Sequence, residues 1–224
     1  MTALSLLTAL VAVLACLGNF IKIGPFPITL TLCPIIIGAA LYGPSAGALL
    51  GFVFGVVTLI TGILAWDGGA YMMLVNANAF WAVLLCLSKG TAAGWISGLV
   101  YRAAAGRKIV RRAFPSENVK NSEASSVDSE TGKESAGEAD LSGGSKLAVV
   151  LAGIACPVTN TGIFLLVTLL VFRDTLAAWA GGTDLLIYAF TGLTGVNFLV
   201  ELTVNMLLAS AVTMIVQYAA KRKS

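Results

Sequence analysis

A long apolar stretch, residues 30–64, constrains this chain more than any other feature of its sequence. It contains no charged residue and is interrupted once, by the turn sequence YGPS at 42–45. Proline fits the first turn of a helix but breaks a helix interior, so Pro44 begins a new helix rather than continuing an old one. The stretch therefore predicts two membrane helices, at about 30–42 and 45–64, joined by a very tight turn.

The overall composition places the whole chain in a membrane. Apolar residues make up 58% of the 224 residues, and charged residues only 11%. A soluble domain of this length cannot hide so much apolar surface, so we predict an all-α integral membrane protein. The net charge of +3 does not indicate nucleic-acid binding, because the basic residues cluster at the predicted helix ends.

Several kinds of chemistry lack the residues they would need. The chain has no His, which removes the commonest general base and transition-metal ligand. The cysteines all lie in apolar segments without metal-ligand spacing, so we expect packing residues and no metal site at Cys16, Cys33, Cys86 and Cys156. Without a His or a metal-ligand cluster we predict no enzyme. The phosphate loop GxxxxGK[ST] does not occur either, so any ATP-driven process would need another subunit to hydrolyse ATP.

Six apolar segments are predicted to cross the membrane. They lie at about 2–18, 30–42, 45–64, 79–102, 147–172 and 196–219. A signal peptide is the competing interpretation of the first segment, since VLAC at 13–16 loosely resembles a lipoprotein cleavage site. We favour a helix there, because no basic region precedes the segment and the following segments are also apolar.

One polar segment divides the chain. Residues 105–146 open with four basic side chains and continue mainly in Ser, Glu and Gly, which predicts a disordered cytoplasmic linker that acts as a spacer. The linker separates four helices in 1–104 from two helices in 147–224, and we expect these two parts to form a single membrane domain.

The distribution of positive charge predicts the orientation. The linker with the adjoining Arg102, together with the C-terminus, holds eleven of the fourteen Lys and Arg residues. The positive-inside rule therefore places both termini and the linker in the cytoplasm. The loops at 19–29, 65–78 and 173–195 then share the outer face. They are rich in Pro, Gly, Asn and aromatic residues, as a lid over a binding site would be.

Small residues recur at helical spacing in three of the predicted helices. Two ladders with a spacing of four residues predict faces where helix backbones approach closely: Gly47, Gly51 and Gly55, and then Gly90, Gly94 and Gly98. The first helix carries the stripe Thr8, Ala12 and Cys16, with Ser5 and Ala9 beside it. These stripes predict either packing inside the bundle or a docking face for another membrane subunit.

Polar side chains inside the predicted membrane helices are the candidate binding residues. A Lys at the bilayer centre costs roughly 2.5–3.5 kcal/mol on insertion scales, so Lys89 is expected to face the protein interior. Asn197 and Glu201 are four residues apart and share one helix face with Asn205. Asn160 follows Pro157, which frees a backbone carbonyl. Together they predict a polar cavity, to which we add Asn76, Asn78 and Trp81 from the outer loop and the helix after it.

Less specific interpretations of the same residues stay open at this point. Lys89 and Glu201 would neutralise each other if they met in the bundle core. Lys89 would instead reach the cytoplasm if it lies low enough in the membrane. The Asn side chains would serve as hydrogen-bonding contacts between helices.

The chain resembles the S components, the substrate-binding membrane subunits, of energy-coupling factor (ECF) vitamin transporters. The resemblance covers nearly everything except the linker and rests on IIIGA at 35–39, LYGP at 41–44, GFVFG at 51–55, GWISGLVY at 94–101, TNT at 159–161, Asn197 and Glu201. It is most similar to the pantothenate-type branch, in which a basic residue lies at the position of Lys89.

This resemblance implies a function that composition alone does not supply. An S component captures a vitamin from outside, in a pocket capped by loops, and then associates with a transmembrane T component and two ATPase subunits. The ATP is used by those partners, and no cofactor is implied in this chain. Docking would use the small residues of the first helix, and the implied location is a bacterial cell membrane.

Three functions follow as hypotheses. The first is an S component that binds pantothenate, with riboflavin or another vitamin as the alternative. The second is a stand-alone secondary transporter coupled to protons through Glu201. The third is a membrane assembly factor that binds no small molecule and uses only its small-residue faces.

Overall fold

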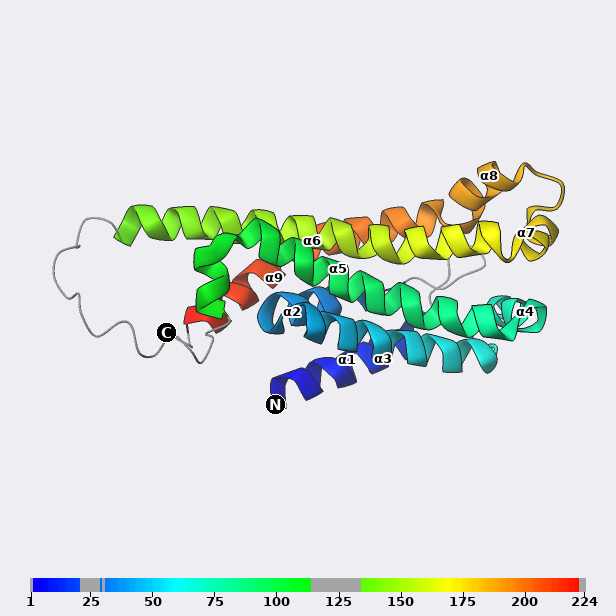
Figure 1. The fold of residues 1–224 in the computed structure, drawn as a ribbon, viewed down its shortest axis with the longest axis horizontal. Helices are drawn as coiled ribbons and strands as arrows, with labels where there is room; N and C mark the ends of the chain where they lie inside the picture. Colours follow the sequence, from blue (N-terminus) through cyan, green and yellow to red (C-terminus); the bar gives the residue numbers. More distant parts are fainter. Residues whose placement is uncertain (1, 21–28, 30, 114–133, 222–224) are drawn as a thin grey trace.

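The structure, a computed structural model, describes residues 2–20, 29, 31–113 and 134–221, and these form an elongated bundle of helices (Figure 1). The helices are α1 (Thr2–Gly18), α2 (Leu32–Tyr42), α3 (Pro44–Ile63), α4 (Ala70–Ala77), α5 (Ala79–Ala113), α6 (Glu134–Leu170), α7 (Arg173–Ala180), α8 (Leu185–Ile187) and α9 (Gly195–Lys221). A π-helical turn at Tyr188–Leu193 joins α8 to α9. No strand occurs within the described residues, which agrees with the predicted all-α class.

The turn between α2 and α3 follows directly from its sequence. Gly43 adopts a φ of 93°, a left-handed conformation that glycine reaches without strain, and its N–H donates to the carbonyl of Ala39. Pro44 is the first residue of α3, where its missing N–H costs nothing. The structure therefore confirms the predicted pair of apolar helices and the tight turn between them.

The two glycine ladders lie against each other where α3 packs along α5. A Cβ added to Gly51 would overlap the carbonyl of Gly90, and one added to Gly47 would overlap the carbonyl of Gly94. At Gly55 the added atom would lie 2.5 Å from the carbonyl oxygen of Cys86. Any side chain on this face would therefore push the two helices apart.

The segments predicted as a linker and as loops contain more helix than expected. α5 continues to Ala113 and α6 begins at Glu134, so the described ends of the predicted linker 105–146 lie in helices. Ala, Arg and Glu favour helices, and extending an existing helix avoids the cost of nucleation. Residues 114–133 lie outside the described residues, so the linker prediction stays a prediction there.

The loops predicted on the outer face also contain helices that the sequence did not indicate. The segment 65–78 contains α4, and the segment 173–195 contains α7, α8 and the π-helical turn. Periodicity over eight residues or fewer is too weak to separate a helix from a loop, which explains why the sequence did not indicate these helices. Within the segment 19–29, residues 21–28 lie outside the described residues.

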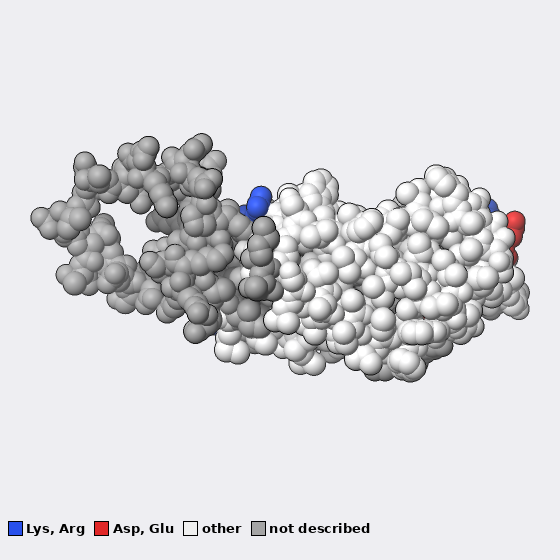
Figure 2. Space-filling model, turned by 90° about the horizontal axis from the view of Figure 1, so that it is seen from below, with Lys and Arg blue, Asp and Glu red and all other residues white. Residues whose placement is uncertain are grey.

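Four stretches among the described residues are long and apolar enough to cross a membrane: Pro44–Ile63, Ala79–Ala105, Lys146–Leu170 and Leu185–Leu208. Two shorter apolar helices accompany them, at Leu4–Gly18 and Leu32–Tyr42. The face drawn in Figure 2 is almost free of charge along its described length, and the charged side chains visible there lie towards its two ends. The chain is therefore a multi-pass membrane protein, and the six predicted spans are supported for four.

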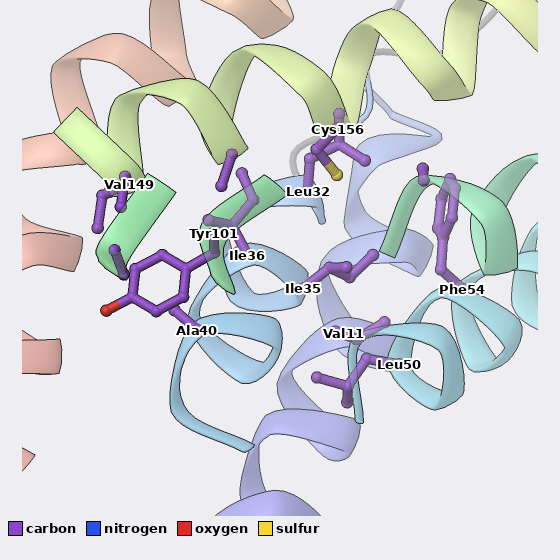
Figure 3. Close-up of a cluster of buried hydrophobic side chains, with 14 residues drawn as sticks. Val11, Leu32, Ile35, Ile36, Ala40, Leu50, Phe54, Tyr101, Val149 and Cys156 are labelled. Carbon is purple, nitrogen blue, oxygen red and sulfur yellow. The ribbon is translucent and has the colours of Figure 1, made fainter. Parts of the chain in front are cut away.

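Two clusters of buried apolar side chains lie one after the other along the bundle. The first includes Val11 of α1, Ile35 of α2, Leu50 of α3 and Tyr101 of α5. Figure 3 shows Val11, Ile35 and Leu50 close together and the ring of Tyr101 beside Ala40. The second joins α4, α5, α6 and α7 with the π-helical turn. Side chains from both clusters line the cavity described below, which therefore lies where the two clusters meet.

We expect the stability of the protein to depend on the close contact between α3 and α5. Gly51→Ala places a Cβ against a backbone carbonyl that cannot rotate away, so the melting temperature of the purified protein should fall, by an amount equivalent to about 1–3 kcal/mol. Gly162→Ala on α6 is the matched control, because its Cβ would meet no atom within 4 Å. Equal melting temperatures for both variants would contradict the packing described here.

Candidate functional site

A partly open cavity of about 70 Å³ lies in the bundle between α1, α3, α4, α5, α6 and α9. This volume holds several water molecules. Its polar lining consists of Asn19, Thr29, Thr31, Thr58, Tyr71, Lys89, Asn160, Thr161, Thr194, Asn197 and Glu201. Many of these residues lie in apolar helices, so the cavity gathers much of the polarity of the bundle into one place.

Four of the predicted binding residues meet in this cavity. Lys89, Asn160, Asn197 and Glu201 all line it, and each exposes no more than 8% of its surface. They come from α5, α6 and α9, which are far apart in the sequence. The predicted polar cavity is therefore present, with one cation, one carboxylate and two amides in its wall.

The three remaining predicted residues lie elsewhere. Asn76, Asn78 and Trp81 are exposed and are not among the residues that line the cavity. The side-chain oxygen of Asn78 accepts a hydrogen bond from the backbone N–H of Trp81, at 3.3 Å. Asn78 precedes α5 in an extended conformation, so its amide caps that helix instead of facing a ligand.

Lys89 is enclosed by aromatic side chains. Its Nζ donates a hydrogen bond to the hydroxyl of Tyr71. The same atom lies 4.9 Å from the ring centre of Tyr71, 5.3 Å from that of Phe164 and 5.9 Å from that of Phe54. These distances allow cation–π attraction, which is strongest where water is excluded. Because Lys89 is buried, it does not reach the cytoplasm.

Glu201 lies in the cavity wall, and its two carboxylate oxygens differ in their hydrogen bonds. Its Oε1 accepts a hydrogen bond from the backbone N–H of Thr29, at 3.1 Å. Its Oε2 is buried and has no hydrogen-bond partner within the described residues. No ion pair joins Glu201 to Lys89 in that part of the chain, so the two charges do not neutralise each other by contact.

Two further oxygens in the cavity wall share this condition. Oδ1 of Asn160 and Oγ1 of Thr31 are buried and have no hydrogen-bond partner among the described residues. A buried polar group without a partner costs about 1–3 kcal/mol, more if it is charged. Hydrogen-bond donors in the cavity would satisfy these oxygens together with Oε2 of Glu201.

The cavity therefore has two chemically distinct sides. Lys89 presents N–H groups, of which the Tyr71 hydroxyl accepts one, and an ammonium has three. Within the described part of the chain, Glu201 and Asn160 present oxygens that still need donors, and Thr31 presents a hydroxyl that can donate or accept. A small molecule with an anionic group at one end and hydroxyl or amide donors at the other matches both sides. No group of three or more His, Cys, Asp or Glu residues that could hold a metal ion occurs among the described residues.

Local backbone features place these side chains. Pro157 lies inside α6 one turn before Asn160, where its ring removes one helical hydrogen bond. The π-helical turn ends at Leu193, and the hydroxyl of Thr194 donates to the carbonyl of Ala189 at 2.9 Å. α9 begins directly afterwards and carries Asn197 into the cavity wall. Short π-helical turns are frequent at functional sites.

Sequence reasoning missed the aromatic residues around Lys89. Phe164 follows Asn160 by four residues on α6 and so shares its face, a relation that helical periodicity would have shown. Phe54 precedes Thr58 on α3 by the same spacing. No helical spacing relates Tyr71 to Lys89. Its position next to Lys89 depends on how the segment before α4 folds.

The predicted docking stripe on α1 divides into two faces. Ser5 and Ala9 are exposed, whereas Thr8, Ala12 and Cys16 are half-buried. Exposed large side chains flank the first pair, among them Leu6, which exposes 71% of its surface, and Val13. Of the two stripes, the Ser5–Ala9 face is the one open to another helix.

Comparison with known proteins gives a match at the level of the family. A family model described as the substrate-specific component of the ECF transporter matches residues 1–217. No curated protein matches the chain. No solved structure matches it either.

We expect the unsatisfied carboxylate to cost stability when the cavity is empty. Glu201→Gln keeps an oxygen for the Thr29 N–H and removes a buried charge. The ligand-free variant should therefore melt about 2–4 °C higher than the wild type, equivalent to about 1 kcal/mol. A lower melting temperature would show that Glu201 contributes to the fold through its charge.

Proposed function

Since the chain belongs to the family of ECF transporter substrate-specific components, we propose that it captures a water-soluble vitamin in the cavity around Lys89 and Glu201. Proteins of this family are transporter subunits rather than enzymes. Pantothenate is our first candidate for the ligand.

The observation that carries this proposal is the pair of unmatched sides in the cavity. Lys89 has N–H groups to offer, whereas Oε2 of Glu201 and Oδ1 of Asn160 need donors. Pantothenate carries a carboxylate at one end, two hydroxyls at the other and an amide between them. Its carboxylate would accept from Lys89, and its hydroxyls would donate to the oxygens on α6 and α9.

The proposed ligand also explains why these groups are tolerated in a membrane protein. Lys89 and Glu201 are costly in an apolar bundle. A bound anion with hydroxyl donors would give each of them a partner without bringing them into contact. The family then supplies the role of this binding, because a substrate-specific component has to recognise one solute and present it to a transport machinery.

We place the bundle in a bacterial cell membrane as six helices with both termini in the cytoplasm. α2 has only 11 residues, too few to span about 30 Å of hydrocarbon. Seven of its residues are buried, however, so neighbouring helices rather than lipid cover most of it. A short helix is tolerated at membrane depth when protein surrounds it. The cavity would then open towards the outside, below α4 and α7.

The partners we propose are a transmembrane T component and two ATPase subunits that use the ATP. The Ser5–Ala9 face of α1 is our candidate for docking on the T component, because small exposed residues allow close helix contact in lipid. No cofactor is proposed for this chain itself.

We expect the vitamin to stabilise the purified protein. A ligand at one hundred times its dissociation constant adds about 2.7 kcal/mol of stability, which a thermal melt detects easily. In a panel of water-soluble vitamins that includes riboflavin, pantothenate should raise the melting temperature most. Lys89→Ala should weaken pantothenate binding by at least about tenfold, equivalent to about 1.4 kcal/mol.

Lys146→Ala is the matched control for charge, since Lys146 is exposed at the start of the α6 span. It should bind pantothenate like the wild type. If another vitamin shifts the melt instead, the ligand is reassigned and the family role is kept. If no vitamin does, the proposed capture of a vitamin by this cavity is wrong.

A further inference from the structure

Asp67 is a buried acid that lies outside the cavity. It exposes 2% of its surface and is in the segment between α3 and α4. Its Oδ1 accepts a hydrogen bond from the N–H of Gly69 at 3.0 Å, and its Oδ2 accepts one from the N–H of Tyr71 at 2.7 Å. One carboxylate thus fixes the backbone at the point where α4 begins.

The second of these bonds leads directly to the cavity. Tyr71 lines the cavity, and its hydroxyl accepts a hydrogen bond from Lys89. Its side chain packs on α3 at Gly62, where an added Cβ would lie 2.6 Å from the Cβ of Tyr71. Contact with α3 therefore restricts the ring of Tyr71. The position of its hydroxyl relative to Lys89 then depends on where the backbone of Tyr71 is held.

The backbone before α4 is shaped for this arrangement. Ala65, Gly68 and Gly69 have φ values of 57°, 85° and 90°, so three residues in the left-handed region surround Asp67. Further along α4, the side chain of Met73 accepts a hydrogen bond from Nε1 of Trp179 on α7, at 3.2 Å. The beginning of α4 is thus tied to Asp67, and its middle is tied to α7.

We propose that Asp67 is a positioning residue for the ligand cavity and that Tyr71 is a specificity-determining residue in it. Asp67 holds Tyr71 so that the Tyr71 hydroxyl occupies one N–H of Lys89. Two N–H groups of the ammonium then remain for the ligand, which favours a group with two acceptor oxygens, such as a carboxylate, over a single hydroxyl. This inference deepens the proposed function and rests on it.

The charge of Asp67 is what distinguishes this role from ordinary helix capping. A neutral Asn or Ser caps a helix about as well as Asp, without the cost of burying a charge. Hydrogen bonds to a carboxylate are shorter and stronger than neutral ones, so the buried charge holds the N–H of Tyr71 more firmly. If Asp67 only capped α4, replacing it would change the ligand dissociation rate equally with and without the Tyr71 hydroxyl.

The first test is the dissociation rate of radiolabelled pantothenate from the purified protein. Asp67→Asn and Tyr71→Phe should each release the ligand about tenfold faster, with little change in the association rate. The double variant should be no faster than about the faster single variant, because both changes remove the same contact with Lys89. An unchanged rate in Asp67→Asn, or additive effects in the double variant, would overturn the proposal.

Asp184→Asn is the matched control. Asp184 also accepts hydrogen bonds from two backbone N–H groups, those of Leu186 at 2.9 Å and Ile187 at 3.1 Å, and neither residue lines the cavity. Its dissociation rate should equal that of the wild type. Gly69→Ala provides a second variant if Asp67→Asn does not fold. Its Cβ would meet no atom within 4 Å, but it strains a φ of 90°, so it should also release the ligand faster.

A second measurement needs no ligand and separates this inference from the proposed function. If the hydrogen bond from Lys89 helps to hold Tyr71 in place, Lys89→Met should increase hydrogen exchange of the backbone amides in 67–77 of the empty protein by at least about tenfold. Lys146→Met should leave that exchange unchanged. Unchanged exchange in Lys89→Met would overturn the inference, whatever vitamin binds. Failure of pantothenate to bind the wild type would reject the proposed ligand alone.

Discussion

The rest of the structure depends on the direct backbone contact between α3 and α5. Glycines on both helices leave no side chain between them, so the two helices approach until a carbonyl of one meets a glycine of the other. Lys89 directly precedes Gly90 in this contact, and Phe54 directly precedes Gly55. The same packing that closes the two helices together therefore brings a phenyl ring to the ammonium group.

The cavity shows how a membrane bundle keeps two opposite charges without joining them. Lys89 is held by a hydroxyl and by aromatic rings, whereas Glu201 is held by one backbone N–H. An ion pair between them would satisfy both charges and leave nothing for a ligand. Keeping them apart leaves Oε2 of Glu201 without a hydrogen-bond partner among the described residues, which costs stability, as is common where a site is preorganised for binding. That cost is the physical reason for our proposal that the cavity binds a ligand.

Much of this arrangement could be predicted from the sequence, for reasons that differ from residue to residue. Pro44 determines a helix start locally, and the glycine ladders are recognised by their helical spacing. Polar residues such as Lys89 and Glu201 stand out in apolar helices. Asn78 is as polar as the residues of the cavity, but the sequence alone does not distinguish an Asn that caps a helix from an Asn that contacts a ligand. Tyr71 and Asp67 could not be assigned, because their positions depend on three left-handed residues and on packing against Gly62.

Whether Lys89 binds an anionic group of the ligand is tested most directly by one comparison. The affinity of the wild type and of Lys89→Met would be measured for pantothenate and for its analogue in which a primary alcohol replaces the carboxylate. We expect the wild type to prefer the acid by at least about tenfold, equivalent to about 1.4 kcal/mol, and the variant to lose this preference. The same preference in both proteins would contradict this expectation, because Lys89 would then not face the charged end of the ligand.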